Sequence, residues 1–152
     1  MKLILLSAIT SFLLTGCGNK NAFTAFNLTP QQEKAIEYTK SDKLVSGDNV
    51  GGFFSAVYLN NILSDIDENT QEFYISVYLK NGYQNLQFSL NRQKATEIQE
   101  LDETNKFTSF LTSQNEWSKN YHIVFSNINN NDLNLSIYTD QFSSGQLMFP
   151  KE

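Results

Sequence analysis

The sequence predicts a mainly β protein, an antiparallel immunoglobulin-like β-sandwich of about seven strands. From residue 50 onward, apolar and polar residues alternate with a period of two, which is the pattern of strands that bury one face. Polar turn segments separate these stretches at intervals of roughly 8 to 14 residues, the spacing expected of a small sandwich. Because the Cys…Trp…Cys pattern of true immunoglobulin domains is missing, a small antiparallel barrel is the main alternative.

A short helix is expected before the strands, over residues 30–40. Thr29-Pro30-Gln31-Gln32 combines an N-cap threonine, a proline at the first helical position and a glutamine placed for a capping box. The polar run 46–49 then breaks the helical pattern. We therefore assign residues 48–152 to the β-domain and residues 17–47 to a tether that contains the helix.

The clearest strand is 73–80, in which buried-type and polar residues alternate without interruption. Asn81-Gly82 follows it and is the strongest short signal for a type I′ turn, so residues 86–90 are expected to return as the partner strand. Residues 92–103 fit either an extended strand or a short helical crossover. The other strands are expected over 53–62, 107–111, 121–126, 133–137 and 146–149.

The first 16 residues have the composition of an export signal. Lys2 supplies the positive charge, and the apolar stretch 3–14 is interrupted only by hydroxyl residues. This stretch of about 12 residues is too short to cross a bilayer, which needs about 20. We therefore expect residues 1–16 to be a signal peptide that is cleaved from the mature protein.

The motif Leu14-Thr15-Gly16-Cys17 resembles the lipobox of bacterial lipoproteins. The resemblance implies cleavage between Gly16 and Cys17, and attachment of a diacylglycerol and an N-acyl chain to Cys17, which would hold the protein to the lipid bilayer. Gly18 stands where such lipoproteins carry an aspartate for inner-membrane retention, so the outer membrane is expected. Orientation toward the periplasm or the cell surface is left open, and the family of the mature domain is not identified.

The charge of the chain excludes one class of partner. The formal net charge is −5 at pH 7, which argues against nucleic-acid binding, since that requires a basic face. The same charge disfavours adhesion to anionic lipid head groups, so the lipid on Cys17 would have to hold the protein at the membrane. Cys17 is the only cysteine, which rules out an intrachain disulfide.

No residue pattern in the chain indicates catalysis. His122 is the only histidine, and no Gly-x-Ser-x-Gly motif accompanies it, so neither a multi-histidine metal site nor a hydrolase elbow is expected. A lipidated Cys17 could not serve as a nucleophile. We therefore expect no enzyme activity, no cofactor and no metal, with a hydrolase that uses His122 as the least favoured hypothesis.

A weak calcium candidate lies in the loop after the first strand. Asp65, Asp67 and Asn69 place side-chain oxygens at alternate positions, which is the spacing of some calcium loops. However, an EF-hand loop that starts at Asp65 needs glycine at position 70 and glutamate at position 76, where the chain has Thr70 and Ser76. A solvated turn is the favoured interpretation.

Three tyrosines form the candidate binding face. If Phe73 and its alternating partners point inward, Tyr74 and Tyr78 lie on the opposite face of the sheet, and Tyr138 is expected there too. Exposed tyrosines suit a protein or glycan partner, although ordinary cross-strand pairing would also explain them. In addition, residues 132–136 resemble an acidic bacterial N-glycosylation sequon centred on Asn134.

The sequence thus favours a membrane-anchored lipoprotein without enzymatic activity. We expect it to act through contacts with another envelope protein, in envelope assembly, adhesion or a structural role. The alternative is a lipoprotein that binds a glycan or small ligand through its tyrosine face or a loop at the end of the sandwich.

Overall fold

A computed structural model of the chain describes residues 28–82, 85–111 and 116–151. The predictions for the signal peptide and for the acylated Cys17 lie outside these residues. Within the described residues, no helix has the length and apolar character that crossing a membrane requires.

The described chain is mainly β, with one α-helix and one short 3₁₀ helix. The helices are α2 (Pro30–Glu37) and η2 (Thr108–Phe110). The strands are β1 (Thr39–Ser46), β2 (Asn49–Tyr58), β3 (Thr70–Leu79), β4 (Gln87–Leu90), β5 (Gln93–Lys94), β6 (Glu97–Leu101), β7 (Lys119–Ser126), β8 (Asp132–Tyr138), β9 (Ser143–Ser144) and β10 (Leu147–Pro150).

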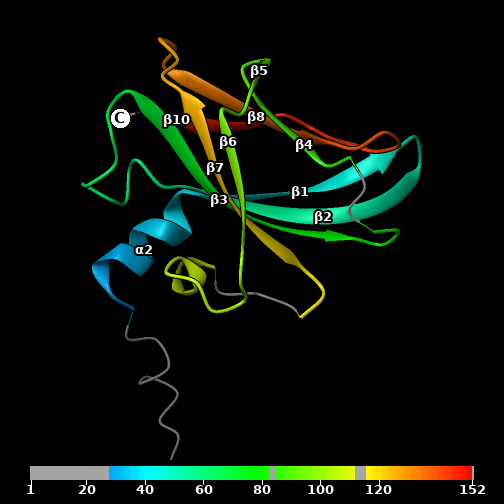
Figure 1. The fold of residues 1–152 in the computed structure, drawn as a ribbon, viewed down its shortest axis with the longest axis horizontal. Helices are drawn as coiled ribbons and strands as arrows, with labels where there is room; N and C mark the ends of the chain where they lie inside the picture. Colours follow the sequence, from blue (N-terminus) through cyan, green and yellow to red (C-terminus); the bar gives the residue numbers. More distant parts are fainter. Residues whose placement is uncertain (1–27, 83–84, 112–115, 152) are drawn as a thin grey trace, which may run out of the picture.

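All of these strands belong to one antiparallel sheet. Its order is β5-β4-β8-β9-β1-β2-β3-β7-β6, and β10 adds to β8. The two ends of this order, β5 and β6, are separated in the chain by residues 95–96 alone, so the sheet must curl until its ends approach each other (Figure 1). Thr96 holds this link in place, because its backbone N–H donates to the carbonyl of Val124 on β7 at 2.8 Å.

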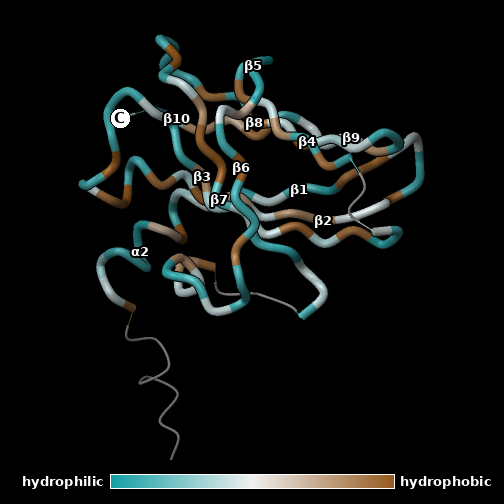
Figure 2. The backbone as a smooth tube through the Cα atoms, viewed as in Figure 1, coloured by the Kyte–Doolittle hydropathy of each residue, from teal (hydrophilic) through white to brown (hydrophobic). Residues whose placement is uncertain are grey.

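The curled sheet packs as two layers with an apolar core between them. Phe149 of β10 lies against Phe73 of β3 and Tyr58 of β2, with ring centroids 5.3 and 6.2 Å away. Phe88 of β4 contacts Tyr121 of β7 at 5.4 Å, which joins the same two layers farther along. The alternation of apolar and polar residues that produces this core is visible along the strands (Figure 2). The predicted mainly β, sandwich-like fold is confirmed, with ten strands instead of about seven.

Helix α2 begins where the sequence predicts. The Thr29 side chain accepts a hydrogen bond from the backbone N–H of Gln32, and the Gln32 side chain accepts one from the backbone N–H of Thr29, which completes the capping box. The helix ends at Glu37, earlier than predicted, because β1 begins at Thr39.

The predicted boundary at residue 48 is wrong, because β1 belongs to the sheet. Residues 39–46 pair with β2 along their whole length, and the side chain of Leu44 is fully buried. The strand escaped prediction because Leu44 is its only fully buried apolar residue, so the segment shows no clear alternation. The folded domain therefore includes α2 and β1.

The predicted hairpin at Asn81-Gly82 is also wrong. β3 pairs with β2 and β7, whereas β4 pairs with β5 and β8 in the other layer. A type I′ turn needs positive φ at both central residues, and of these two residues only Gly82 has it. That turn type is found instead at Asn91-Arg92, with φ of +49° and +69°, directly between the paired residues Leu90 and Gln93.

Residues 92–111 differ in part from the prediction. The ambiguous segment 92–103 is extended and contains β5 and β6. Residues 107–111, expected as a strand, form η2, because Asn105 accepts a hydrogen bond from the backbone N–H of Phe107 at 2.9 Å and starts a turn. The turn buries Phe107 and Phe110, three residues apart, on the same side.

A chain of polar contacts runs from the core to the surface beside the last strand. The buried Tyr58 hydroxyl donates to Gln71 Oε1, and Gln71 Nε2 donates to Asn127 Oδ1 at 3.1 Å. Lys151 Nζ completes the chain at 2.7 Å from Asn127 Oδ1. Burial raises the pKa of Tyr58 from 10.0 to about 12, because the phenolate would lose its hydration.

Replacing Tyr58 with phenylalanine should change both the stability and its dependence on pH. At pH 8 we expect a loss of about 1–3 kcal/mol in the free energy of unfolding, since Gln71 Oε1 loses its buried donor. Above pH 10 the unfolded tyrosine ionises while folded Tyr58 does not. Its contribution is therefore complete below pH 10, and up to about 3 kcal/mol is lost between pH 10 and 12.

Urea unfolding at pH 8 and pH 11 measures both effects. Tyr58→Phe should show a smaller fall between the two pH values than the wild type. Tyr138→Phe, at a partly exposed tyrosine, is the matched control for the loss of one phenol group. Equal falls in all three proteins would contradict the assignment to Tyr58.

Candidate functional site

The predicted tyrosine face does not exist as one surface. Tyr74 is fully buried, whereas Tyr78 and Tyr138 are partly exposed. Tyr78 lies on β3 and Tyr138 on β8, and β9, β1 and β2 stand between these two strands in the sheet order. The proposal that the three residues bind a ligand together is therefore wrong.

Tyr74 is buried because the outer face of β3 carries a second, smaller core. The segment around η2 folds back over this face and places the Phe107 ring 5.6 Å from the Tyr74 ring. Phe110 lies beside Phe107, and helix α2 packs next to η2 with its fully buried Ala35. An alternating strand pattern cannot reveal this cover, because it arises from residues more than 30 positions away in the chain.

The weak calcium candidate is an ordinary turn. Asp67 Oδ1 accepts hydrogen bonds from the backbone N–H of Asn69 at 2.8 Å and from its side-chain amide at 3.0 Å. The Asp67 carbonyl accepts from the backbone and hydroxyl of Thr70, so the loop uses its own oxygens to close the turn. Across the described residues, no group of three or more His, Cys, Asp or Glu side chains could hold a metal ion.

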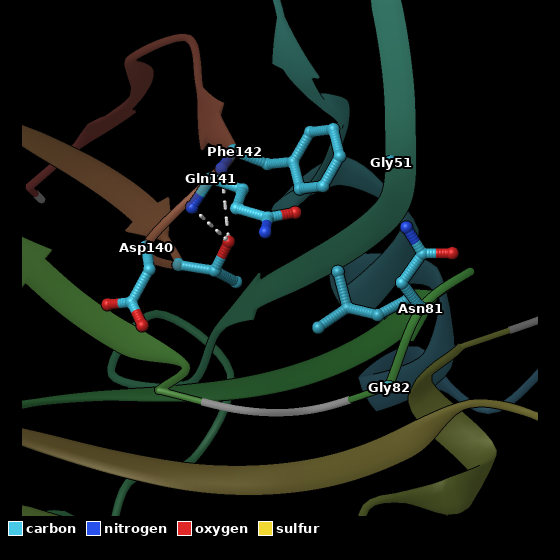
Figure 3. Close-up of a pocket in the computed structure, with 8 residues that line it drawn as sticks. Gly51, Asn81, Gly82, Asp140, Gln141 and Phe142 are labelled. Atoms are coloured by element: carbon cyan, nitrogen blue, oxygen red, sulfur yellow. Dashed lines mark hydrogen bonds between the residues drawn. The ribbon is translucent and has the colours of Figure 1, made fainter.

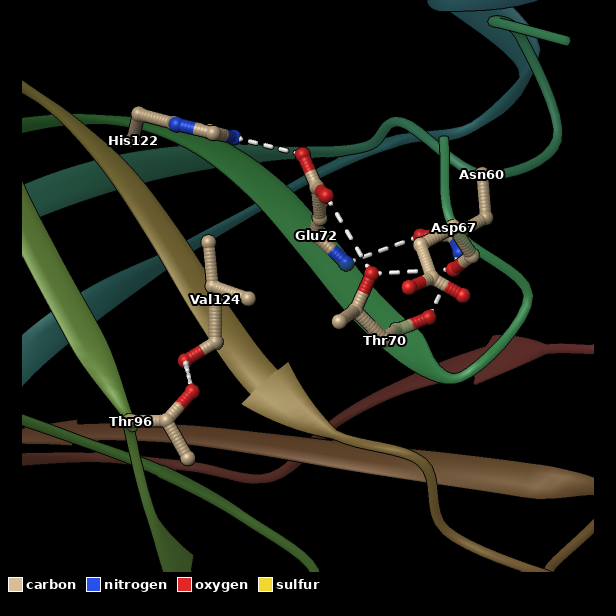
Figure 4. A network of polar contacts seen from close by, with 7 residues as sticks. All are labelled: Asn60, Asp67, Thr70, Glu72, Thr96, His122 and Val124. Atoms are coloured by element: carbon tan, nitrogen blue, oxygen red, sulfur yellow. Dashed lines mark hydrogen bonds and ion pairs between the residues drawn. The ribbon is translucent and has the colours of Figure 1, made fainter. Parts of the chain in front are cut away.

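The single histidine lies in a polar cluster on the outer face of β3 and β7 (Figure 4). His122 Nε2 is 2.8 Å from Glu72 Oε2, and both side chains are less than one fifth exposed. Thr70 Oγ1 donates to the other Glu72 oxygen at 3.2 Å, and the Phe107 ring lies 5.2 Å from the imidazole. Glu72 thus orients His122, but no serine, threonine or cysteine is bonded to the imidazole among the described residues.

A hollow of about 230 Å³ opens at one end of the sandwich, between strand ends and the turn 139–142 (Figure 3). Thr139 Oγ1 accepts from the backbone N–H of Gln141 at 3.3 Å and of Phe142 at 3.1 Å, which fixes the turn. The Phe142 ring covers Gly51 so closely that an added Cβ would lie 2.6 Å from it. Asp140 bonds the Asn85 side chain. These polar groups serve the turn itself.

A second concavity, of about 330 Å³, lies on the outer face of β4 and β8. We call it the amide groove. Ser89 and Ser136 are direct cross-strand partners in its floor, and Asn134 is on the same face two residues along β8. Every residue that lines it is polar: Ser89, Asn91, Arg92, Asn130, Asn134, Ser136 and Gln146.

Neither a protein-family model, nor a curated protein, nor a solved structure matches this chain. The function of the protein must therefore be inferred from its own surfaces.

The amide groove is the feature that the sequence patterns did not predict. Its one sequence signal is Asn91-Arg92 between two short alternating stretches, which is weaker than Asn81-Gly82 because arginine rarely adopts positive φ. The candidate sequon residue Asn134 falls inside the groove, and its side-chain oxygen is buried.

Replacing Phe107 with alanine should expose Tyr74 and destabilise the domain. Removing a buried phenylalanine costs about 3–5 kcal/mol in the free energy of unfolding, and Phe107 is 2% exposed. Urea unfolding measures the loss, and iodination followed by mass spectrometry measures access to Tyr74. Phe53→Ala, at a ring that is 51% exposed, is the control and should cost less than about 1 kcal/mol. A Phe107→Ala protein as stable as this control would show that the outer core is not needed.

Proposed function

We propose that the protein is a lipid-anchored, non-enzymatic lipoprotein of the outer membrane that works through contacts with another envelope protein. The lipobox-like motif Leu14-Thr15-Gly16-Cys17 supports the anchor, which would consist of a diacylglycerol and an N-acyl chain on Cys17. The single observation that supports the contact role is an exposed apolar cluster on the outer face of β1, β2 and β3.

This cluster, which we call the β2 patch, consists of Val45, Val50, Phe53 and Tyr78. Val50 pairs with Val45, and Phe53 pairs with Tyr78. The register shifts next to Val45, so that Gly51 is an extra residue, and Val50 and Phe53 share one face although they are three positions apart. Val50 is 41% exposed and Phe53 is 51% exposed.

Contiguity distinguishes the β2 patch from the other exposed apolar residues. Ile36, Ile98 and Met148 are each about half exposed, and Trp117 is 73% exposed. They lie on α2, on β6, on β10 and in the segment before β7, in separate parts of the fold. Scattered apolar residues are normal on a protein surface, whereas a group that includes aromatic rings is typical of protein interfaces. Two lysines border the patch across the strands: Lys43 lies opposite Phe53, and Lys80 donates its backbone N–H to the Gly51 carbonyl beside Val50.

The surroundings of His122 support a structural role for this residue over a catalytic one. Its partner Glu72 is held by Thr70 and by Asn60, whose Oδ1 accepts from the Glu72 backbone N–H at 2.8 Å. The cluster therefore ties β3 and β7 to the loop after β2, and its hydrogen bonds connect structural elements.

Replacing Cys17 with serine should abolish the lipid anchor. A serine hydroxyl cannot form the thioether, so palmitate labelling should be lost and the protein should leave the membrane fraction. Labelling of cells that express wild-type or Cys17→Ser protein, followed by fractionation, measures both. Labelling that persists in the variant would overturn the anchor.

Phe53 should lie at the contact with the partner. A photo-reactive phenylalanine analogue at position 53, activated in intact cells, should form a discrete adduct that disappears when Val50→Asp is added. The same analogue at Ile98, which is 50% exposed, is the matched control and should give no adduct that depends on Val50. Identical adducts from both positions would contradict a role for the β2 patch.

A further inference from the structure

The amide groove shares no residue with the β2 patch and has the opposite chemistry. Its lining consists of amide, hydroxyl and guanidinium groups, without one apolar residue. The β4–β5 turn at its rim lies on the side of the molecule opposite α2, the helix into which the tether leads (Figure 1). A surface of this kind is suited to a polar ligand.

Arg92 occupies a backbone conformation that is unfavourable for it. Its φ is +69°, in the second central position of the type I′ turn, where glycine is preferred. Asparagine tolerates the first position, occupied by Asn91, but arginine has no such tolerance. Among the described residues, the Arg92 side chain makes neither a hydrogen bond nor an ion pair, so no such bond within that part of the chain compensates for this strain. Strain without an internal compensation is characteristic of positions that contact a ligand.

The turn that presents Arg92 is held rigidly against β8. The Asn91 backbone N–H donates to the Asn134 carbonyl at 2.9 Å, and the Asn134 backbone N–H donates to Asn91 Oδ1 at 2.7 Å. Asn91 Nδ2 also donates to the Asp132 carbonyl at 3.1 Å. Arg92 is therefore fixed at the rim of the groove, and little further ordering of the backbone would be needed when a ligand binds.

The groove also contains an acceptor without a donor. The Oδ1 atom of Asn134 is buried and has no hydrogen-bond partner. Buried polar groups are almost always paired in folded proteins, and an exception points to a missing water or ligand group. A hydroxyl group of a ligand that lies in the groove close to Ser89 and Ser136 would supply this donor. The side-chain amide of Asn134 would need to rotate slightly to accept the bond.

We propose that the amide groove binds an acidic saccharide. Arg92 would hold its carboxylate through the paired N–H groups of the guanidinium, and the amides and hydroxyls of Asn134, Ser89 and Ser136 would bond the sugar hydroxyls. Lys94 pairs with Ser89 and adds a second positive charge on the same face, where Asp132, two residues before Asn134 on β8, contributes one negative charge. The chain as a whole has a net charge of −5 and repels anions. The positive charges of Arg92 and Lys94 would attract an anion to the groove in spite of this repulsion.

Calorimetric titration of the full-length chain in detergent with trigalacturonic acid tests the proposal. The wild type should bind this probe, and its fully methyl-esterified, neutral form should bind about tenfold more weakly or worse. Inorganic sulfate should not displace it at equal concentration. Absence of binding, equal binding of the neutral ester, or displacement by sulfate would each overturn the proposal.

Arg92→Gly separates binding from folding. Glycine adopts φ of +69° without strain, so the melting temperature should stay the same or rise, while affinity for trigalacturonic acid should fall about tenfold or more. Lys34→Gln removes one positive charge from α2 and should leave affinity unchanged. An Arg92→Gly protein that binds within about twofold of the wild type would overturn the assignment of Arg92.

The test of saccharide binding is independent of the test of the proposed contact between the β2 patch and a protein partner. The groove shares no residue with the β2 patch, so Arg92→Gly should leave the adduct from position 53 intact. If Arg92→Gly loses saccharide binding and keeps the adduct, the result supports the amide groove as the saccharide site. If the variant loses both, it is misfolded, which contradicts the expected melting temperature.

Discussion

The burial of β3 on both of its faces is the constraint on which the rest of the structure depends. Phe73, Ile75 and Val77 face the core between the layers, and Tyr74 on the opposite face is equally buried. The opposite layer of the sandwich covers only the inner face of β3. The outer face, which carries Tyr74, therefore needs a second cover. Helix α2 and the η2 segment provide it, which is why the folded domain begins at the helix and why η2 turns back toward the sheet.

Burial of β3 also determines which surfaces are left for function. Phe107 covers the outer face of β3 at Tyr74, so a ligand cannot use that tyrosine. Two surfaces remain with distinct chemistry: the apolar β2 patch and the polar amide groove on the outer face of β4 and β8. The two proposals assign a protein partner to one surface and a saccharide to the other.

The predictions that succeeded depend on local patterns. Thr29 and Gln32 specify the helix start through bonds between residues three apart, and the alternation in β3, β7 and β8 identifies these segments as strands. It does not reveal that β3 is buried on both faces. The failures involve contacts between distant parts of the chain. β1 carries Leu44 as its only fully buried apolar residue, and Asn81-Gly82 lies between strands of different layers, so neither segment shows locally where it pairs.

The sequence by itself determined the β class, the start of the helix and the candidate lipidation site, because each depends on residues close together in the chain. Only the tertiary structure decided that Tyr74 is buried, that Arg92 is held at positive φ, and that Asn134 lies between Ser136 and Asn91 in a groove. The physical reason is that exposure and concavity arise from the packing of distant segments. A period of two in the sequence distinguishes the two faces of a strand, but it does not show what covers each face.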